Sequence, residues 1–92
     1  MSQDIPPEES LIEYPSEFPI KVMGRAHPDL AQVLTEVVLQ FDPAFDPATV
    51  EMRPSSSGNY MGLTFRVTAT SRQQLDDLYQ ALHGHTMVSV VL

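Results

Sequence analysis

The chain has 92 residues, with 12 Asp or Glu against 5 Lys or Arg, and a formal net charge of −7. This length accommodates one domain, and the absence of cysteine excludes a disulfide framework, a thiolate metal site and a thiol nucleophile. The excess of carboxylates disfavours nucleic acid and anionic membranes as partners, because both are bound by clustered Lys and Arg. With no signal-peptide pattern and no membrane-length apolar stretch, we expect a cytoplasmic protein.

The first ten residues are polar, acidic and interrupted by Pro6-Pro7, a composition typical of a disordered tail. We therefore expect residues 1–10 to form a disordered acidic N-terminal tail and residues 11–92 to form a single domain. Leu11, Ile12 and Tyr14 should pack against that domain.

Residues 18–24 (FPIKVMG) alternate between apolar and other side chains and end at a glycine, as a strand does. The predicted core-facing residues are Phe18, Ile20 and Val22. Lys21 and Met23 should then point to the opposite face.

A helix is predicted to begin at Pro28, with Asp29 in its first turn, where a negative charge is favourable. Apolar residues follow at helical spacing: Leu30, Val33, Leu34, Val37, Val38 and Phe41. The helix should end before residues 42–47, because two Asp-Pro pairs there favour extended or turn geometry. We expect Asp42 and Asp46 to be solvated.

Residues 49–53 alternate again and are closed by Pro54, which suits an edge strand because proline has no N–H for a ladder. Residues 55–59 (SSSGN) have the composition of a hairpin loop. Residues 63–69 form the clearest predicted strand. Its predicted inward side chains are Leu63, Phe65 and Val67.

A second helix begins at a capping box formed by Ser71 and Gln74. Its apolar stripe consists of Leu75, Leu78, Tyr79 and Leu82. Gly84 fits the C′ position after that helix, and residues 87–92 complete the pattern with a last strand.

Strand, helix, strand, strand, helix, strand is the order of the ferredoxin-like split βαβ fold, an α+β class. Right-handed crossovers place both helices on one face of a four-stranded antiparallel sheet. The first and third strands are then central, and the other face of the sheet is open.

The residues that usually carry catalysis are not grouped. His83 and His85 lack the further ligands that a metal site needs, and His83 suits a helix end while His27 flanks a helix start. Asp76 and Asp77 are adjacent on a helix, so their side chains diverge by about 100° and cannot share a proton. We find no nucleophile elbow, P-loop or dinucleotide fingerprint. The sequence predicts a protein that is not an enzyme and needs no metal or cofactor.

Two activities that this fold can host also lack their residues. RNA-recognition domains need stacking aromatics on the central strands, but the outward positions of residues 63–69 are Thr64, Arg66 and Thr68. Gly24-Arg25 lies where acylphosphatases bind an anion, without the surrounding glycine-rich loop.

One predicted surface concentrates basic side chains. Lys21, Arg53 and Arg66 should project from the open sheet face. Their predicted neighbours there are Met23, Glu51, Met87, Ser89 and Val91. This face is either an ordinary solvated sheet with cross-strand ion pairs such as Glu51 with Arg66, or a binding surface for an anionic small molecule, a partner protein or a second copy.

The hairpin loop offers a second candidate site with residues Ser55, Ser56, Gly58, Asn59 and Tyr60. Its backbone N–H groups could form an anion-binding nest. A simple hairpin turn explains the same composition.

Several sequence blocks resemble the YbeD-like family of small uncharacterised bacterial proteins. They are residues 11–15 (LIEYP), Phe18, residues 21–24 (KVMG), residues 53–56 (RPSS), residues 58–60 (GNY), Leu78-Tyr79 with Leu82, and residues 87–92. The resemblance covers residues 11–92. The chain departs from it at Ser57, where lysine is common, and at Met61-Gly62, which replace a more polar pair.

The resemblance implies a ferredoxin-like fold similar to ACT domains, which sense amino acids in metabolic enzymes. It implies no established activity, and a link to lipoate metabolism by association only. Our first interpretation is an ACT-like regulatory module that binds a small metabolite or a protein, compatible with a weak homodimer. The alternative is a protein-interaction adaptor that uses the open sheet face.

Overall fold

The computed structural model describes residues 13–92 and confirms the predicted ferredoxin-like α+β fold. The elements in chain order are β1 (Ser16–Arg25), α2 (Leu30–Phe41), the 3₁₀ turn η1 (Pro47–Thr49), β2 (Glu51–Pro54), β3 (Tyr60–Ala69), α3 (Arg72–His83) and β4 (Val88–Val91). The predicted tail at residues 1–10, together with Leu11 and Ile12, lies outside the described residues. Tyr14 is exposed rather than packed against the domain.

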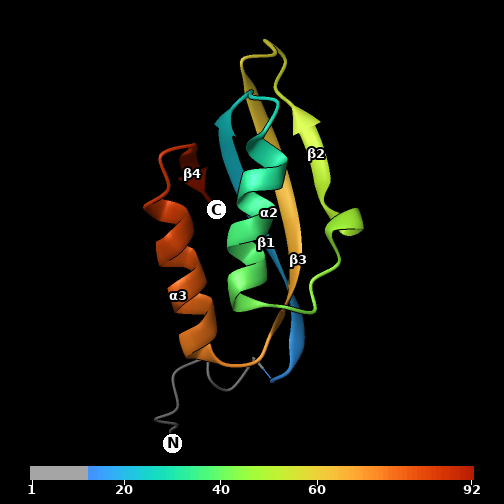
Figure 1. Ribbon diagram of the computed structural model, residues 1–92, viewed down its shortest axis with the longest axis vertical. Coiled ribbons are helices and arrows are strands. Elements are labelled where there is room, and N and C mark those ends of the chain that lie inside the picture. The colour runs from blue at the N-terminus through green and yellow to red at the C-terminus, as the bar shows by residue number, and fades with distance from the viewer. Residues whose placement is uncertain (1–12) are drawn as a thin grey trace, which may run out of the picture.

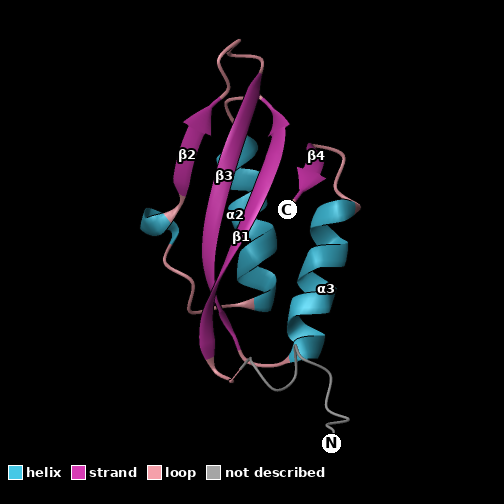
Figure 2. Ribbon diagram, turned by 180° about the vertical axis from the view of Figure 1, so that it is seen from behind, coloured by secondary structure: helices cyan, strands magenta, loops and turns pink. Residues whose placement is uncertain are grey.

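The four strands form one antiparallel sheet in the order β2-β3-β1-β4. The first and third strands are central, and β2, which contains Pro54, is an edge strand as predicted. Both helices lie on one face of the sheet (Figure 1), and no helix of residues 13–92 covers the other face (Figure 2). None of the helices in residues 13–92 is both long enough and apolar enough to cross a membrane.

The core lies between the sheet and the two helices. Alternation in β1 and β3 directs every second side chain toward the helices, so the predicted inward phase of both strands is confirmed. The most completely buried large side chains are Phe65, Ile20, Leu30, Leu34, Leu63, Leu78, Leu82, Val38 and Val67. Phe18 is half-buried at the end of this row.

The helix ends differ slightly from the sequence prediction. Helix α2 begins at Leu30, because Pro28 and Asp29 form the turn that precedes it, and the Asp29 side chain caps no backbone N–H. At the other helix, Gly84 follows His83 as predicted but has a φ of −83°, so it provides no left-handed cap. The Ser71 hydroxyl accepts a hydrogen bond from the Gln74 backbone N–H at 3.0 Å, as the capping box requires.

The last strand has a different phase from the predicted one. Val91 pairs with the inward-facing Val22, and Val90 pairs with Met23, but Val88 pairs with Gly24, so the register shifts by one residue. This bulge directs Val91 inward and Val90 outward, which corrects the prediction that Met87, Ser89 and Val91 share the open face. Met87, Val88 and Val91 pack against the core.

Gly24 makes this close approach of β4 feasible. A Cβ atom at Gly24 would overlap the carbonyl oxygen of Met87 and would lie 3.3 Å from Leu30 Cδ1. A side chain at this position is therefore incompatible with the observed seating of β4 on β1.

Two polar side chains hydrogen-bond to the last residues of β3, which extend beyond its pairing with β2. Asp42 is 5% exposed, and its Oδ2 atom accepts a hydrogen bond from the Thr68 N–H at 2.9 Å. The prediction that Asp42 is solvated is thus wrong, whereas Asp46 is exposed and caps η1. Gln74 Nε2 donates to the carbonyl oxygens of Thr68 and Phe41. Together these bonds join the end of α2, the end of β3 and the start of α3.

Candidate functional site

The open sheet face carries the basic side chains that the sequence placed there. Strand pairing sets Lys21 of β1 opposite Thr64 of β3, and Thr64 opposite Glu51 of β2. One step along, Gly62 lies between Met23 and Arg53. Arg66 lies opposite Pro19. Because directly paired residues share a face of the sheet, Lys21, Met23, Arg53 and Arg66 lie together on this open face.

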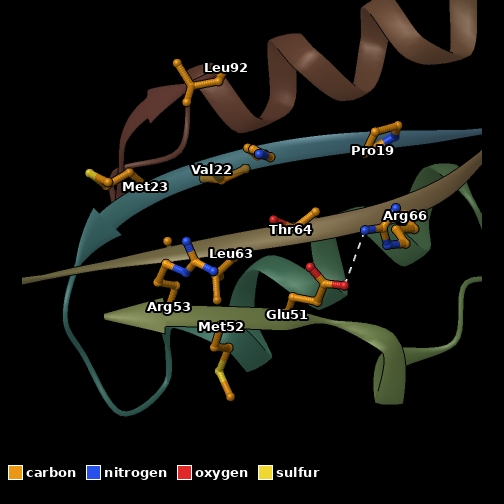
Figure 3. Close-up of a pocket in the computed structure, with 12 residues that line it drawn as sticks. Pro19, Val22, Met23, Glu51, Met52, Arg53, Leu63, Thr64, Arg66 and Leu92 are labelled. Atoms are coloured by element: carbon orange, nitrogen blue, oxygen red, sulfur yellow. Dashed lines mark hydrogen bonds and ion pairs between the residues drawn. The ribbon is translucent and has the colours of Figure 1, made fainter. Parts of the chain in front are cut away.

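A hollow of about 510 Å³ lies over the middle of this face. Its lining includes all four of these predicted residues and also Glu51, Gly62 and Thr64. Figure 3 shows Arg53 and Thr64 on neighbouring strands here, while Met52 points away from them. Gly62 contributes no side chain, so the backbone of β3 forms the floor between Met23 and Arg53.

The cations of the hollow differ in their ion pairs. Arg66 Nη2 lies 3.3 Å from Glu51 Oε2, the cross-strand pair expected from the sequence, and both side chains are largely exposed (Figure 3). Within residues 13–92, Lys21 and Arg53 have no carboxylate at ion-pairing distance. Lys21 and Arg53 are therefore the two charges of the hollow that an incoming anion could neutralise.

Arg25 and Tyr60 extend this surface, although neither was predicted to lie on it. They pair across β1 and β3, and the Arg25 guanidinium lies 5.7 Å from the Tyr60 ring centroid, within the range of a cation–π contact. The prediction that Tyr60 belongs to the hairpin loop is corrected, since it is the first residue of β3. The alternation of residues 63–69, continued backward over Gly62, would have indicated this.

Several backbone N–H groups of the hairpin loop donate hydrogen bonds within the loop itself. The N–H of Tyr60 donates to the Ser55 hydroxyl, and that of Asn59 donates to the Ser57 hydroxyl. The N–H of Gly58 donates to the Ser55 carbonyl oxygen, and Gly58 has a φ of +78°. Ser56 is exposed at the loop tip. These bonds account for a stable turn, and they leave fewer N–H groups for the anion-binding nest that the sequence also allowed.

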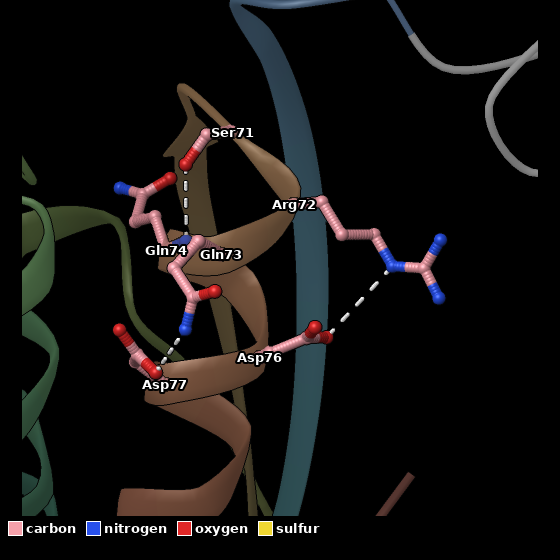
Figure 4. Close-up of polar contacts among 6 residues, drawn as sticks. All are labelled: Ser71, Arg72, Gln73, Gln74, Asp76 and Asp77. Atoms are coloured by element: carbon pink, nitrogen blue, oxygen red, sulfur yellow. Dashed lines mark hydrogen bonds and ion pairs between the residues drawn. The ribbon is translucent and has the colours of Figure 1, made fainter.

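The remaining titratable side chains are dispersed. Asp76 lies 3.9 Å from Arg72, and Asp77 accepts from Gln73, so the two carboxylates diverge as predicted (Figure 4). His85 Nδ1 accepts from the Met87 N–H, and His83 lies in the last turn of α3. No group of three or more His, Cys, Asp or Glu that could hold a metal ion occurs in the described part of the chain.

A second hollow, of about 530 Å³, lies on the helix side between α2 and the β2 edge. Its lining is mainly apolar and includes Ala31, Val50 and Met52. Met52 faces this side because it pairs with the inward-facing Leu63, yet it is 59% exposed. No basic side chain lines it, so an anion would be drawn to the sheet face instead.

Comparisons with known proteins place the chain among bacterial proteins without an assigned activity. Residues 9–92 match the family described as "Protein of unknown function (DUF493)". The chain is 81% identical to a UPF0250 protein of Bordetella parapertussis over 89 residues, 97% of this chain and 98% of the relative. It is 63% identical to the UPF0250 protein of Leptothrix cholodnii, over 98% and 99% of the two chains.

Among solved structures, the chain is similar to the solution structure of protein HP0495 from H. pylori. The TM-score is 0.73 with 16% sequence identity, over 98% of each chain. This likeness supports the ferredoxin-like fold and nothing beyond it.

Proposed function

Since the chain belongs to the DUF493 family, as its resemblance to YbeD-like proteins indicated, we propose a function for it from its own surface. We propose that it is a non-enzymatic, ACT-like regulatory module that binds a small anion on the open sheet face. The family is one of unknown function. The observation that carries the proposal is the hollow on this face, where Lys21 and Arg53 lie without carboxylate partners among residues 13–92.

The composition of the hollow favours a ligand with an anionic group and an apolar part. Lys21 and Arg53 provide charge-assisted hydrogen-bond donors. Met23 is 38% exposed and Leu92 is 73% exposed, and both line the same hollow and offer apolar contact. A small carboxylic acid with an aliphatic chain has this chemistry. Lipoate and amino acids, which the family resemblance associates with these proteins, are therefore the first carboxylates to test.

A thermal-shift series with lipoate and a set of amino acids tests the proposal. A ligand at about 100 times its Kd adds about 2.7 kcal/mol to the free energy of unfolding, which raises Tm of a domain this small by roughly 10–20 °C. The double variant Lys21→Glu with Arg53→Glu should melt close to the wild type but lose the shift. Arg72→Glu, which reverses one basic charge on α3 where the double variant reverses two on the sheet face, should keep it.

A second variant removes space rather than charge. A Cβ at Gly62 would meet only the Arg53 carbonyl oxygen, at 3.4 Å, so Gly62→Val should fold and fill the floor of the hollow. A carboxylate that shifts Tm of both variants as it does the wild type would show that the sheet face is not its site.

An interaction adaptor is the second candidate, favoured by the exposed apolar side chain of Val90 beside Met23 on the open face. In that case no small molecule raises Tm. The wild-type protein instead retains a protein partner that Lys21→Glu with Arg53→Glu releases, with Arg72→Glu again as control. Retention of the same partner by the double variant would contradict the adaptor proposal.

A further inference from the structure

Strand β2 lies at an edge of the sheet (Figure 2), and one of its residues directs unpaired backbone groups outward. The Ser55 N–H donates to the Tyr60 carbonyl oxygen, so the backbone groups of Ser55 point toward β3. Because this direction alternates along a strand, Glu51 and Arg53 also point toward β3, and Met52 points away from it. In the described part of the chain, no strand lies beyond β2. The N–H and C=O of Met52 are therefore available to another strand.

The two outward positions next to Met52 offer no further N–H. The Val50 N–H already donates to the Pro47 carbonyl oxygen at 3.3 Å, and Pro54 has no N–H. A strand that pairs with this edge must therefore accept its hydrogen bond from Met52. The edge is suited to one short partner strand that is centred on this residue.

The residues on either side of Met52 carry opposite charges. Glu51 and Arg53 both project to the open sheet face and are exposed. If β2 pairs antiparallel with β2 of a second copy, centred on Met52, each Glu51 lies directly opposite Arg53 of the other copy. Directly opposed residues share a face of the sheet, so two opposite-charge pairs form. A pairing centred on Glu51 or on Arg53 would instead set like charges opposite each other, which is destabilising.

The Met52 side chain points to the other face of the sheet, where it is 59% exposed. It lines the second hollow, which is mainly apolar, together with Ala31 and Val50. In the pairing centred on Met52, the two copies of this residue lie opposite each other, with Cα atoms about 5.5 Å apart. Their side chains then contact each other, and methionine is flexible enough to fill an irregular space between two molecules.

We propose that β2 binds β2 of a second copy of this chain, antiparallel and centred on Met52, and extends the four-stranded sheet to eight strands. The inference goes beyond the proposed function and does not depend on it. Both open faces then lie on the same side of the joined sheet. Glu51 is shared between Arg66 of its own chain and Arg53 of the second copy, so each anion-binding hollow keeps an excess of positive charge.

Two complementary charge variants test the position of the pairing. Glu51→Arg alone sets basic side chains opposite each other, and Arg53→Glu alone sets acidic ones opposite each other. In sedimentation velocity, each variant should self-associate at least about tenfold more weakly than the wild type. An equimolar mixture of the two variants has opposite charges at both positions, so it should form a dimer as the wild type does.

Three results of this experiment would overturn the proposal. The first is a wild-type sedimentation coefficient that does not rise with concentration. The second is self-association of either single variant at the wild-type strength. The third is a mixture of the two variants that stays monomeric.

Cross-linking provides a direct measurement, because the chain has no cysteine. A short bismaleimide should join Met52→Cys to a second copy, since the two positions lie opposite each other. Met23→Cys is the matched control, because Met23 is an exposed methionine of the open face, and this variant should stay monomeric. Cross-linking of Met23→Cys but not of Met52→Cys would show that copies meet through the open face, and the edge inference would be wrong.

The edge pairing and the anion site can fail separately. Lys21 lies on β1, away from the β2 edge, so Lys21→Glu should lose the carboxylate-dependent rise of Tm and keep the wild-type self-association. If the wild type is monomeric but a carboxylate raises its Tm, the edge inference is wrong and the ligand site stands. If the mixed charge variants form a dimer and no carboxylate raises Tm, the edge pairing stands and the open face binds no such ligand.

Discussion

The seating of β4 on β1 depends on one missing methyl group, and Gly24→Ala tests this directly. The added Cβ would overlap the Met87 carbonyl oxygen, which belongs to the backbone and cannot turn aside as a side chain would. Leu30 Cδ1, at 3.3 Å, blocks a shift toward α2. We expect β4 either to move as a unit or to leave the sheet.

The expected loss of stability of Gly24→Ala can be estimated from the cost of overpacking. Overpacking a well-packed region costs about 1–3 kcal/mol, set against a total stability of about 5–15 kcal/mol. For a domain of this length, each kcal/mol lowers Tm by roughly 4–8 °C. Gly24→Ala should therefore lower Tm by roughly 4–24 °C, and hydrogen exchange should show the largest loss of protection in β4 and the facing half of β1.

The neighbouring strand provides a matched control. Gly62→Ala makes the same chemical change on the sheet, but its Cβ meets only the Arg53 carbonyl oxygen, at an ordinary 3.4 Å. This variant should melt at or above the wild-type Tm, because alanine loses less backbone entropy on folding. If calorimetry gives Gly24→Ala and Gly62→Ala the same Tm as the wild type, the close approach of β4 to β1 is refuted.

Three further substitutions have defined outcomes. Asp42→Ala removes the buried carboxylate that accepts from the part-buried Thr68 N–H and should cost about 1–3 kcal/mol in urea unfolding, with Asp42→Asn less damaging; equal effects would contradict the hydrogen-bond argument. Ser71→Ala removes the cap on Gln74 N–H and should cost about 1 kcal/mol, whereas Ser71→Asp should be neutral by the same measurement. Burial raises the pKa of Tyr79 above 10.0, so the folded state holds its proton more tightly, and stability present below pH 10 should fall above it. Tyr79→Phe should remove part of this alkaline loss in thermal melts, and an unchanged pH profile would contradict it.

Periodicity was sufficient to predict the sheet wherever apolar and polar residues truly alternate. Ile20, Val22, Leu63, Phe65 and Val67 face the helices as their spacing indicates, because a one-residue shift would expose the whole set. These phases also determine the outward positions, so Lys21, Arg53 and Arg66 could be placed on the open face from sequence alone.

The same rule fails at the last strand for a clear reason. Residues 87–92 (MVSVVL) are apolar at nearly every position, so alternation does not distinguish the two faces. The phase is set by a bulge opposite Met23 and Gly24, and that bulge depends on how closely two backbones approach. Such tertiary geometry leaves no periodic signal.

Polar contacts between residues far apart in the chain could not be predicted from the sequence either. Asp42 follows a helix and precedes a proline, as many solvated residues do, yet it is buried by a contact with Thr68, which is 26 positions away. The Gln74 backbone N–H donates to the Ser71 hydroxyl as predicted, whereas its side chain accepts from the Thr70 N–H and donates to the Phe41 carbonyl oxygen. The first contact depends on the packing of α2 against β3 and the second on the packing of α2 against α3, neither of which local sequence encodes. Arg25 and Tyr60 were missed because strand ends are less regular than strand centres.

The short pairing between β4 and β1 limits how copies of this domain could associate. β4 pairs with β1 only at residues 22–24, so within residues 13–92 the N-terminal half of β1 has no neighbour on that side. Leu92 N–H donates to the Lys21 carbonyl oxygen, so the backbone groups of Lys21 point toward the β4 side of β1. Pro19 lies two residues earlier, so its backbone points to the same side, but proline has no N–H to donate to an added strand. Continuous strand addition there is thus interrupted, which protects the edge from amyloid-like stacking. A homodimer that extends the sheet along this part of β1 is therefore disfavoured.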